Sequence, residues 1–258
     1  MTKIQAKSAQ SPLTSGQVEV GLAYDGNTSP AGIHGLTELF KYANQFAAKR
    51  QKSRAASPIR VTHWRADDGD KLRCTYDSCP GSAHALTALI VPGSGQATVE
   101  PIKDGAMVGW LLQQHEQGVV IAGVCSGVFI LAKTALLSGR QATTHWALSN
   151  QFADQFADVL LGSDQMVIDY GDVVTAGGVL AWADLGLRLV ERFLGPTIMS
   201  DTAHYMLVDP PRARTTLLQR LHTQHETRGR RDIESTTLAR NASRTACRCC
   251  APGATIRA

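Results

Sequence analysis

The sequence contains no apolar run long enough to cross a bilayer as a helix. Residues 1–16 are polar and rich in Ser, Thr and Gln, and they lack the apolar core of a secretory signal peptide. We therefore expect a cytoplasmic protein with no membrane partner. Hydrophobic residues make up 43% of the chain, which is typical of a soluble globular protein with a substantial core.

A zinc-like pattern is also missing. The run Cys247-Arg248-Cys249-Cys250 has no second pair of ligands at a suitable spacing elsewhere in the chain. In a reducing compartment, the cysteines are expected to be free thiols rather than a disulfide framework. We therefore expect no metal site and no cofactor.

Basic charge is concentrated at the C-terminal end. From Arg212 onward the chain has ten arginines, no lysine and three acidic residues, whereas the whole chain has a net charge of +4. Apolar residues are too sparse beyond His222 to bury a core, so this stretch is expected to be disordered. It could bind nucleic acid through phosphates without sequence preference, but we favour a solvated tail without function.

The most informative stretch is an apolar run, 119–124, followed by Cys125 and then by a helical pattern at 128–137. Gly123 and Gly127 flank the cysteine at two positions on either side. A nucleophile on a sharp strand-to-helix turn needs small neighbours of this kind, and a helix N-terminus lowers the pKa of a thiol. The alternative is a small residue packed at a tight corner between a strand and a helix.

Strands and helices alternate along most of the chain, which predicts an α/β fold with a mostly parallel, doubly wound sheet. Strands are predicted at 18–23, 59–64, 88–91, 119–124, 166–168 and 173–175, with a short hairpin around Asp68-Gly69. Helices are predicted at 33–48, around 107–112, at 128–137 and 148–156, from Ala176 to Phe193, and at 196–207.

Four segments with chemically useful residues come directly after predicted strands. They are Tyr24-Asp25, Pro92-Gly93, Cys125 and Thr143 to His145. Ligand sites in such sheets form at the carboxyl ends of the strands, so we expect these segments to share one site.

Four motifs in the chain are informative when they are taken together. They are Val91-Pro92-Gly93, Gly123-Val124-Cys125-Ser126-Gly127, Thr143-Thr144-His145-Trp146, and Gly171 to Gly178 followed by Asp184 and Glu191 to Gly195. With these motifs, residues 18–211 resemble the ThiJ/PfpI branch of the class I glutamine amidotransferase-like superfamily. Within that branch the chain is similar to two groups, the isonitrile hydratases and the sensor-like N-terminal domains of AraC-type transcriptional regulators.

This resemblance implies a flavodoxin-like sandwich that is often dimeric, with Cys125 as the nucleophile and His145 beside it. It also implies that amides near Gly93 and Ser126 form an oxyanion hole. Such a set would let a thiolate attack an electrophilic carbon while N–H groups hold the developing charge. The alternative for His145 is a residue at a helix start that is hydrogen-bonded to the backbone.

The chain departs from the enzymes of this family at the position of their acid. Those enzymes carry a carboxylate a few residues before the glycine that matches Gly35, whereas residues 29–34 here include no acid. Asp25 is a candidate substitute, but it is equally well explained as a turn aspartate. Ser94 also replaces the usual second glycine. Without the carboxylate, general acid/base turnover would be weakened.

These features lead to a domain interpretation with a polar segment 1–16, a ThiJ/PfpI-like domain 17–211 and an Arg-rich tail 212–258 without an intact helix-turn-helix domain. We expect a ligand-sensing domain of an AraC-type regulator rather than an enzyme, cut short or frame-shifted before its DNA-binding module. The expected partners are a small-molecule ligand at Cys125 and a second copy of the chain, with DNA only if a binding module is supplied elsewhere. The alternatives are a cysteine-dependent hydratase, hydrolase or glyoxalase-type lyase, and a protein that signals by oxidation of Cys125.

Overall fold

The computed structural model describes residues 17–51, 57–66, 72–94, 96, 105–162 and 165–209. The chain divides into two units, Met1–Arg214 and Thr215–Ala258, and every described residue belongs to the first. The predicted tail 212–258 and the segment 1–16 lie outside the described residues.

A seven-stranded sheet forms the centre of the first unit, in the order β3-β2-β1-β4-β5-β9-β8. The five inner strands run parallel, and the two edge strands β3 and β8 are antiparallel to their neighbours. The bounds are β1 Val18–Tyr24, β2 Ile59–Ala66, β3 Leu72–Asp77, β4 Leu86–Val91, β5 Val120–Val124, β8 Val167–Asp169 and β9 Val173–Ala176. The expected flavodoxin-like, doubly wound sheet is therefore confirmed.

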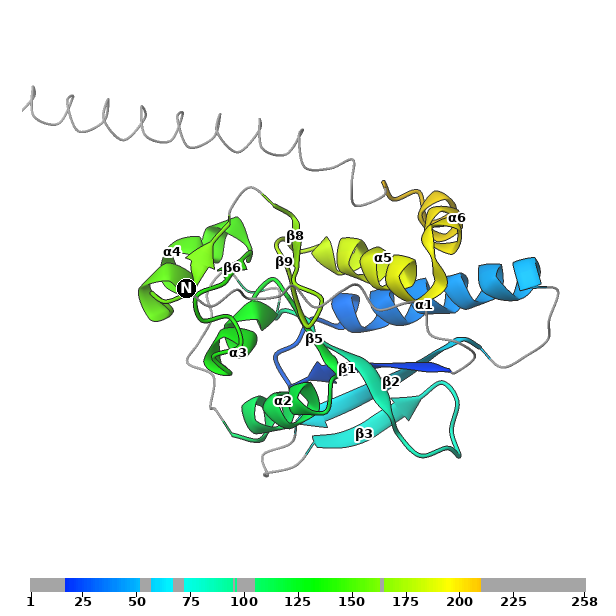
Figure 1. Ribbon diagram of the computed structural model, residues 1–258, viewed down its shortest axis with the longest axis horizontal. Coiled ribbons are helices and arrows are strands. Elements are labelled where there is room, and N and C mark those ends of the chain that lie inside the picture. The colour runs from blue at the N-terminus through cyan, green and yellow to red at the C-terminus, as the bar shows by residue number, and fades with distance from the viewer. Residues whose placement is uncertain are drawn as a thin grey trace, which may run out of the picture. The chain divides into compact units, whose positions relative to one another are not determined.

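Helices cover both faces of this sheet (Figure 1). Helices α1, α5 and α6 pack against one another, and α2 packs against α3. Their bounds are α1 Pro30–Gln51, α2 Ala106–Glu116, α3 Gly127–Lys133, α4 Ser149–Gln155, α5 Ala181–Leu194 and α6 Pro196–Met206, with a short 3-10 helix η1 at Trp146–Leu148. The chain reverses its winding direction between β1 and β4, and this is where sites form in open α/β sheets.

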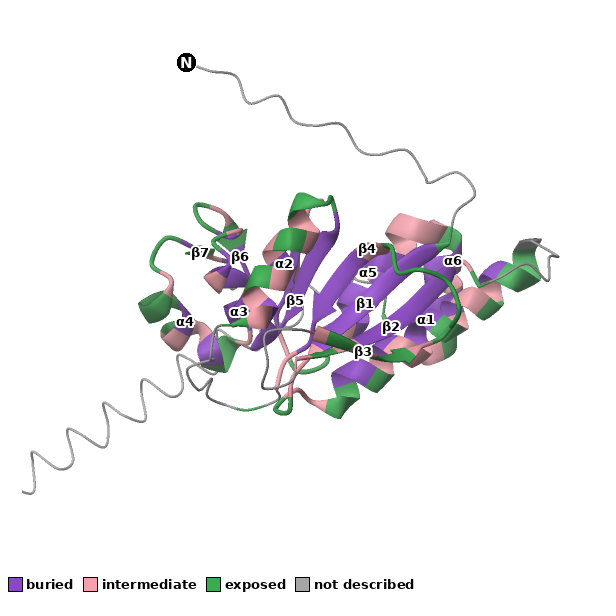
Figure 2. Cartoon of the chain, turned by 90° about the horizontal axis from the view of Figure 1, so that it is seen from below, coloured by how far each residue is buried: buried purple, intermediate pink, exposed green. Residues whose placement is uncertain are grey.

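The core lies along the central strands, as the burial colours in Figure 2 show. All five residues of β5 are buried, which explains why its sequence is a continuous apolar run instead of an alternating one. A side chain at Gly21 in β1 would collide with Leu86, Leu89 and Trp64, so the glycine allows these large side chains to pack over the sheet.

Most predicted elements are confirmed, and the differences have local causes. The helix expected from Ala176 begins at Ala181, because Gly178 has φ +114° and the chain turns before it enters α5. Helix α3 ends at Lys133 instead of Leu137, since Ala135 adopts φ +59°. The predicted hairpin is present as the antiparallel pair β2–β3, although its turn at Asp68-Gly69 lies outside the described residues. A two-stranded parallel pair, β6 Gln141–Ala142 with β7 Leu160–Leu161, was not predicted.

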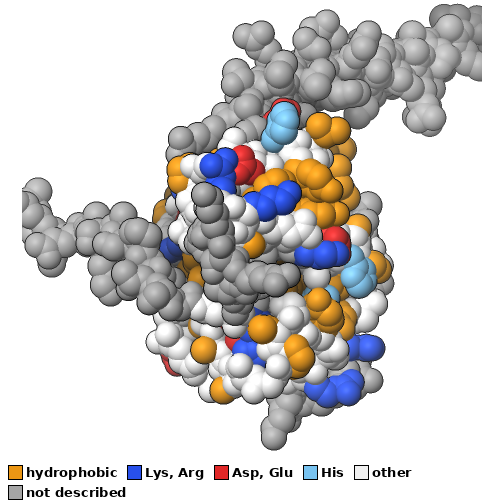
Figure 3. Space-filling model, turned by 90° about the vertical axis from the view of Figure 1, so that its right-hand side faces the viewer, with side chains coloured by type: hydrophobic (Ala, Val, Ile, Leu, Met, Phe, Trp, Pro, Cys, Tyr) orange, Lys and Arg blue, Asp and Glu red, His pale blue; other side chains and the backbone are white. Residues whose placement is uncertain are grey.

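Hydrophobic side chains gather on the face that carries α6 and the end of α1 (Figure 3). Tyr205 is 59% exposed and Leu207 is 91% exposed. The Tyr205 ring lies 4.9 Å from the Tyr42 ring and 5.7 Å from the Phe46 ring. None of the described helices has the length and apolar content that a membrane span requires.

Candidate functional site

Cys125 lies directly after β5, on the sharp turn that leads into α3. Its φ is +57°, in the left-handed region that a residue with a β-carbon rarely adopts. Its N–H donates to the Ala176 carbonyl at 2.8 Å, and its own carbonyl accepts from the Thr144 hydroxyl at 2.7 Å. Backbone in this region costs about 1–3 kcal/mol and persists where the surroundings hold it, so the turn has the backbone geometry of a nucleophile elbow.

The environment of the Cys125 thiol differs from the expectation of a lowered pKa. Burial raises the pKa of Cys125 above its ordinary value of 9.0, and a backbone hydrogen bond from Ser126 only partly opposes this. The residue is 4% exposed, so a thiolate here would lose hydration that the short helix α3 does not replace. The group is therefore a protonated thiol at neutral pH, and the predicted lowering was wrong.

Gly93 lies against Cys125, and Ser126 follows Cys125 in the chain. A β-carbon at Gly93 would lie 2.9 Å from the Cys125 β-carbon, so only glycine allows this approach. The Ser126 hydroxyl accepts a hydrogen bond from the Ser94 N–H at 2.7 Å and also bonds the Ser94 hydroxyl at 3.1 Å. Ser94 therefore ties the loop after β4 to the elbow, and this gives a structural reason for a serine at that position.

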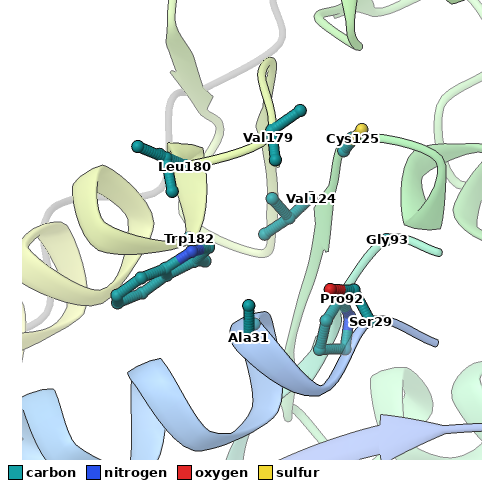
Figure 4. A pocket seen from close by; sticks show the side chains of 10 residues that line it. Ser29, Ala31, Pro92, Gly93, Val124, Cys125, Val179, Leu180 and Trp182 are labelled. Atoms are coloured by element: carbon teal, nitrogen blue, oxygen red, sulfur yellow. The ribbon is translucent and has the colours of Figure 1, made fainter. Parts of the chain in front are cut away.

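A pocket of about 40 Å³ opens beside Cys125 at the carboxyl ends of the strands (Figure 4). Three segments besides the elbow form it: the start of α1, the loop after β4, and the connection from β9 into α5. None of the described lining residues carries a charged side chain. They are Ser29, Ala31, Gly32, Pro92, Gly93, Val124, Cys125, Val179, Leu180 and Trp182.

His145 does not line this pocket, although the residue before it is hydrogen-bonded to the elbow. It follows Thr144, whose hydroxyl is bonded to the Cys125 carbonyl. Its ring nitrogen Nδ1 accepts a hydrogen bond from the Ala147 N–H at 3.2 Å, and its side chain caps the short helix η1. This contact matches the alternative role considered for His145, a residue at a helix start that is hydrogen-bonded to the backbone. The direct Cys125–His145 pair stays a prediction.

Asp25 belongs to the turn between β1 and α1. Its Oδ1 accepts from the Asn27 N–H and from the Thr28 hydroxyl, both at 2.9 Å. These are the bonds of an aspartate that organises a turn, and Asp25 does not line the pocket. The neighbouring segment contributes Ser29, Ala31 and Gly32 to the lining instead. No described lining residue therefore supplies the missing carboxylate, and an acid role for Asp25 stays a prediction without support from its contacts.

The connection from β9 into α5 supplies three lining residues that the sequence analysis did not single out: Val179, Leu180 and Trp182. Val179 is 60% exposed and Leu180 is 62% exposed, so both lie at the mouth. The Gly177-Gly178 pair at the end of a predicted strand was the available signal, because a glycine-rich break at a carboxyl end marks a loop at the site edge.

The arrangement favours binding over acid/base chemistry. It offers a buried thiol and an apolar wall. The oxyanion role of amides near Gly93 and Ser126 stays a prediction. Within the part of the chain that the structure describes, no cluster of three or more His, Cys, Asp or Glu side chains is placed to hold a metal ion. Cys74, Cys79 and Cys125 are free cysteines, and the C-terminal cysteines lie outside the described residues.

A model of the DJ-1/PfpI family matches residues 41–192. An isonitrile hydratase from Pseudomonas putida is 32% identical over 126 residues, which cover 48% of this chain and 51% of that protein. The HTH-type transcriptional regulator CdhR from Pseudomonas aeruginosa is 33% identical over 104 residues, 40% of this chain and 31% of the regulator. The chain thus spans about half or less of the length of these curated relatives.

Solved structures of similar fold include an AraC family transcriptional regulator from Pseudomonas putida, with a TM-score of 0.57 and 18% identity over 73% of this chain and 99% of that one. DJ-1beta from Drosophila melanogaster has a TM-score of 0.55 and 16% identity over 75% of this chain and 99% of that one. At these identities the likeness establishes the shared fold.

Proposed function

Because the chain belongs to the DJ-1/PfpI family, we propose that residues 17–211 are a ligand-sensing domain of an AraC-type transcriptional regulator. The regulators named CdhR, GbdR and ArgR from Pseudomonas aeruginosa are among its relatives. The DNA-binding module that such a regulator requires is proposed to come from elsewhere, since the Arg-rich stretch 212–258 does not read as a helix-turn-helix domain.

One observation carries this proposal: the elbow thiol faces a pocket whose described lining contains no acid or base. The Cys125 pKa is raised, so the nucleophilic thiolate is scarce at neutral pH. A group that accepts and returns protons has to lie within hydrogen-bond reach of the reacting atoms. A pocket with a thiol and without such a group can bind a ligand while turning it over slowly or not at all.

A thermal-shift screen of the full chain against a library of small metabolites tests the sensing function. Ala31 is exposed, lies on α1 and lines the pocket, so Ala31→Leu should narrow the pocket without disturbing the core. We expect at least one compound to raise the melting temperature of the wild type, to lose this effect in Ala31→Leu, and to be recovered unchanged by mass spectrometry. A library without any compound of this behaviour would contradict a sensing role.

A second candidate is a cysteine-dependent enzyme, a hydratase, hydrolase or glyoxalase-type lyase acting through Cys125 and His145. The similarity to an isonitrile hydratase and the strained elbow support it. Turnover of isonitriles or methylglyoxal that disappears in Cys125→Ala would establish this enzyme and replace the sensor. We expect no such turnover.

We further propose that the chain acts in the cytoplasm as a homodimer. The exposed apolar residues Tyr205 and Leu207 support self-association, because contiguous apolar surface on a soluble protein commonly marks an interface. Sedimentation velocity of the full chain should show a dimer, and a monomer across the accessible concentration range would rule it out.

A further inference from the structure

The connection from β9 into α5 brings a tryptophan to the pocket, and one atom of it is unusual. The Nε1 atom of Trp182 is buried and has no hydrogen-bond partner among the described residues. A buried N–H without a partner is uncommon in folded proteins, because it has lost its bonds to water and gained none. Trp182 also lines the pocket beside Cys125. A ligand in the pocket would supply the missing acceptor if its binding opened a path to this N–H, which is closed to water in the free protein.

The packing of the indole fixes which edge is available. A β-carbon at Gly35 in α1 would lie 2.5 Å from Cη2 and 2.7 Å from Cζ2 of Trp182, so the six-membered ring rests directly on the helix backbone. The pyrrole edge, with Nε1, is then turned away from α1, as Figure 4 shows. The ring is held as a rigid wall because Gly35 leaves it no space to move closer.

The other described lining residues limit the kind of ligand that can accept a hydrogen bond from Trp182 Nε1–H. The side chains of Ala31, Pro92, Val124, Val179 and Leu180 are apolar, and no described lining residue carries a charge. An ion buried here would lose its hydration without gaining a counter-ion from these walls, and that loss is costly. A neutral molecule with one hydrogen-bond acceptor loses far less, because Nε1–H can replace the water that the acceptor gives up.

We propose that the pocket binds a small, uncharged, mainly apolar molecule that carries a hydrogen-bond acceptor such as a carbonyl, and that Trp182 Nε1–H donates to that acceptor. The apolar part of the ligand lies against Val179 and Leu180 at the mouth. The inference rests on the proposed sensing function and names the chemical class of its ligand. It makes Trp182 a binding residue, with Cys125 beside the acceptor-bearing carbon.

A series of probes with the same branched shape separates charge from shape. It consists of 3-methyl-2-butanone, isobutyramide, isobutyrate and isobutyramidinium, in which a neutral acceptor group is replaced by an anion or a cation. Binding to the full chain is measured by ligand-observed NMR, and the Ala31→Leu variant reports binding at the pocket. We expect the ketone and the amide to bind with millimolar affinity, as befits molecules of this size, and the two ions to bind at least about tenfold more weakly.

Trp182→Phe tests the donor, since it keeps an aromatic ring and removes the N–H. We expect it to weaken binding of the ketone by about two- to tenfold, the usual effect of one hydrogen bond. The melting temperature without ligand should stay the same or rise, because an unpartnered buried N–H contributes nothing favourable to the fold. Trp110→Phe is the matched control: Trp110 packs on Trp64, away from the pocket lining, and its replacement should leave ketone binding unchanged.

The outcomes separate the ligand class from the sensing function. Tighter binding of isobutyrate or isobutyramidinium than of the ketone, lost in Ala31→Leu, would overturn the uncharged class and leave the pocket as a sensor. Equal ketone affinity in wild type and Trp182→Phe would overturn the role of Nε1. If no probe responds to Ala31→Leu, and the metabolite screen is equally silent, the sensing function fails together with its ligand class.

Discussion

The strained backbone of Cys125 is held by contacts that its neighbours in sequence do not supply. Its N–H donates to the Ala176 carbonyl, its carbonyl accepts from the Thr144 hydroxyl, and the backbone of Gly93 lies close to its β-carbon. Each of these partners comes from a different segment of the carboxyl edge. The elbow is therefore stable only when β4, β5 and β9 are assembled, and the thiol is presented at the place where those segments meet.

The raised pKa of Cys125 predicts a slow thiol with an alkaline pH profile. Since burial shifts its pKa above the ordinary 9.0, the thiolate fraction at pH 7 is smaller than that of an unfolded cysteine. Alkylation by iodoacetamide, followed at Cys125 by peptide mapping between pH 7 and about pH 10, should be slower than in the urea-unfolded chain and should rise with pH throughout. A folded-state profile that levels off at a lower pH than the unfolded one would refute this.

The raised pKa of Cys125 also predicts how the stability of the fold changes with pH. A thiol whose folded pKa is raised favours the folded state while it is protonated. Its contribution is therefore complete below pH 9.0 and is lost as the pH rises above that value.

Gly127 should be indispensable for the fold of the elbow. A β-carbon there would overlap the carbonyl oxygen of Val91 in the neighbouring strand, and a backbone atom cannot move aside as a side chain end can. Gly127→Ala is expected to lower the free energy of unfolding by about 1–3 kcal/mol, the range of overpacked cores. Urea unfolding followed by circular dichroism measures it.

Gly109 is the control for this substitution. It lies in the interior of α2, and a β-carbon there would meet nothing within 4 Å. Gly109→Ala should therefore raise the free energy of unfolding by about 0.5–1 kcal/mol, since alanine restricts the unfolded chain and favours the helix. Equal effects of the two substitutions would mean that the close approach of Gly127 is not what stabilises the elbow.

Residue-level prediction from the sequence worked where a local rule decides the geometry. A strand that ends in a small-residue turn before a helix places Cys125 and Ser126 with little freedom, whereas Gly93 reaches them through the parallel pairing of β4 with β5. The contacts of His145 and Asp25 depend on their own turns, where a ring nitrogen caps η1 and a carboxylate binds the next residues. The position of Trp182 could not be predicted for a different reason. Its ring packs where Gly35 has no side chain, and Gly35 is far from Trp182 in the sequence.

At the scale of elements, His63 connects strand β2 to helix α1. Its Nε2 lies 2.8 Å from the Thr37 hydroxyl, and that hydroxyl gives its single proton to the Ile33 carbonyl. Nε2 is therefore the donor. Burial, with a smaller contribution from His34, lowers the pKa of His63 to about 4, and Tyr24 and Tyr76 cover the ring without offering a negative charge.

This histidine should make the fold sensitive to acid. Because the folded pKa lies below the ordinary 6.5, protonation favours the unfolded state. The stability is complete above pH 6.5 and is lost as the pH falls towards 4, by up to about 3 kcal/mol. Melting temperatures between pH 7 and about pH 4 should fall more steeply for the wild type than for His63→Gln. His204→Gln, on the exposed surface of α6, should behave like the wild type, and parallel curves for all three would exclude His63 as the cause.

Element boundaries were predicted well for buried strands and less well for helix starts. The apolar run of β5 has one physical interpretation, because a strand covered on both faces contains no polar positions. The start of α5 was placed five residues too early, because Gly177 and Gly178 fit either a helix entry or a turn, and only tertiary contacts decide. A β-carbon at Gly177 would lie 2.5 Å from the Thr144 carbonyl oxygen, so this glycine belongs to the packed edge of the site and not to the helix.

For the whole molecule, helix α5 joins the pocket to α6, the last helix that the structure describes. Trp182 lies in its first turn at the pocket, and its other end packs with α6, after which the described chain ends at Asp209. A sensor needs a rigid element of this kind between ligand and output. The sequence could predict both helices, but it could not show that the first turn of α5 lines the same pocket as Cys125.

Charge distribution gives the last prediction, which concerns DNA. Ten arginines follow Asp209, against three acidic residues, and arginine side chains can contact phosphates without reading bases. Fluorescence anisotropy with two unrelated duplexes should therefore give equal affinities, and both should fall steeply and in parallel between about 50 and 200 mM salt. We expect the domain itself to add no sequence preference, because its proposed ligand is a small molecule. A salt-resistant preference for one duplex would show that residues 210–258 recognise an operator, and the regulator would then need no module from elsewhere.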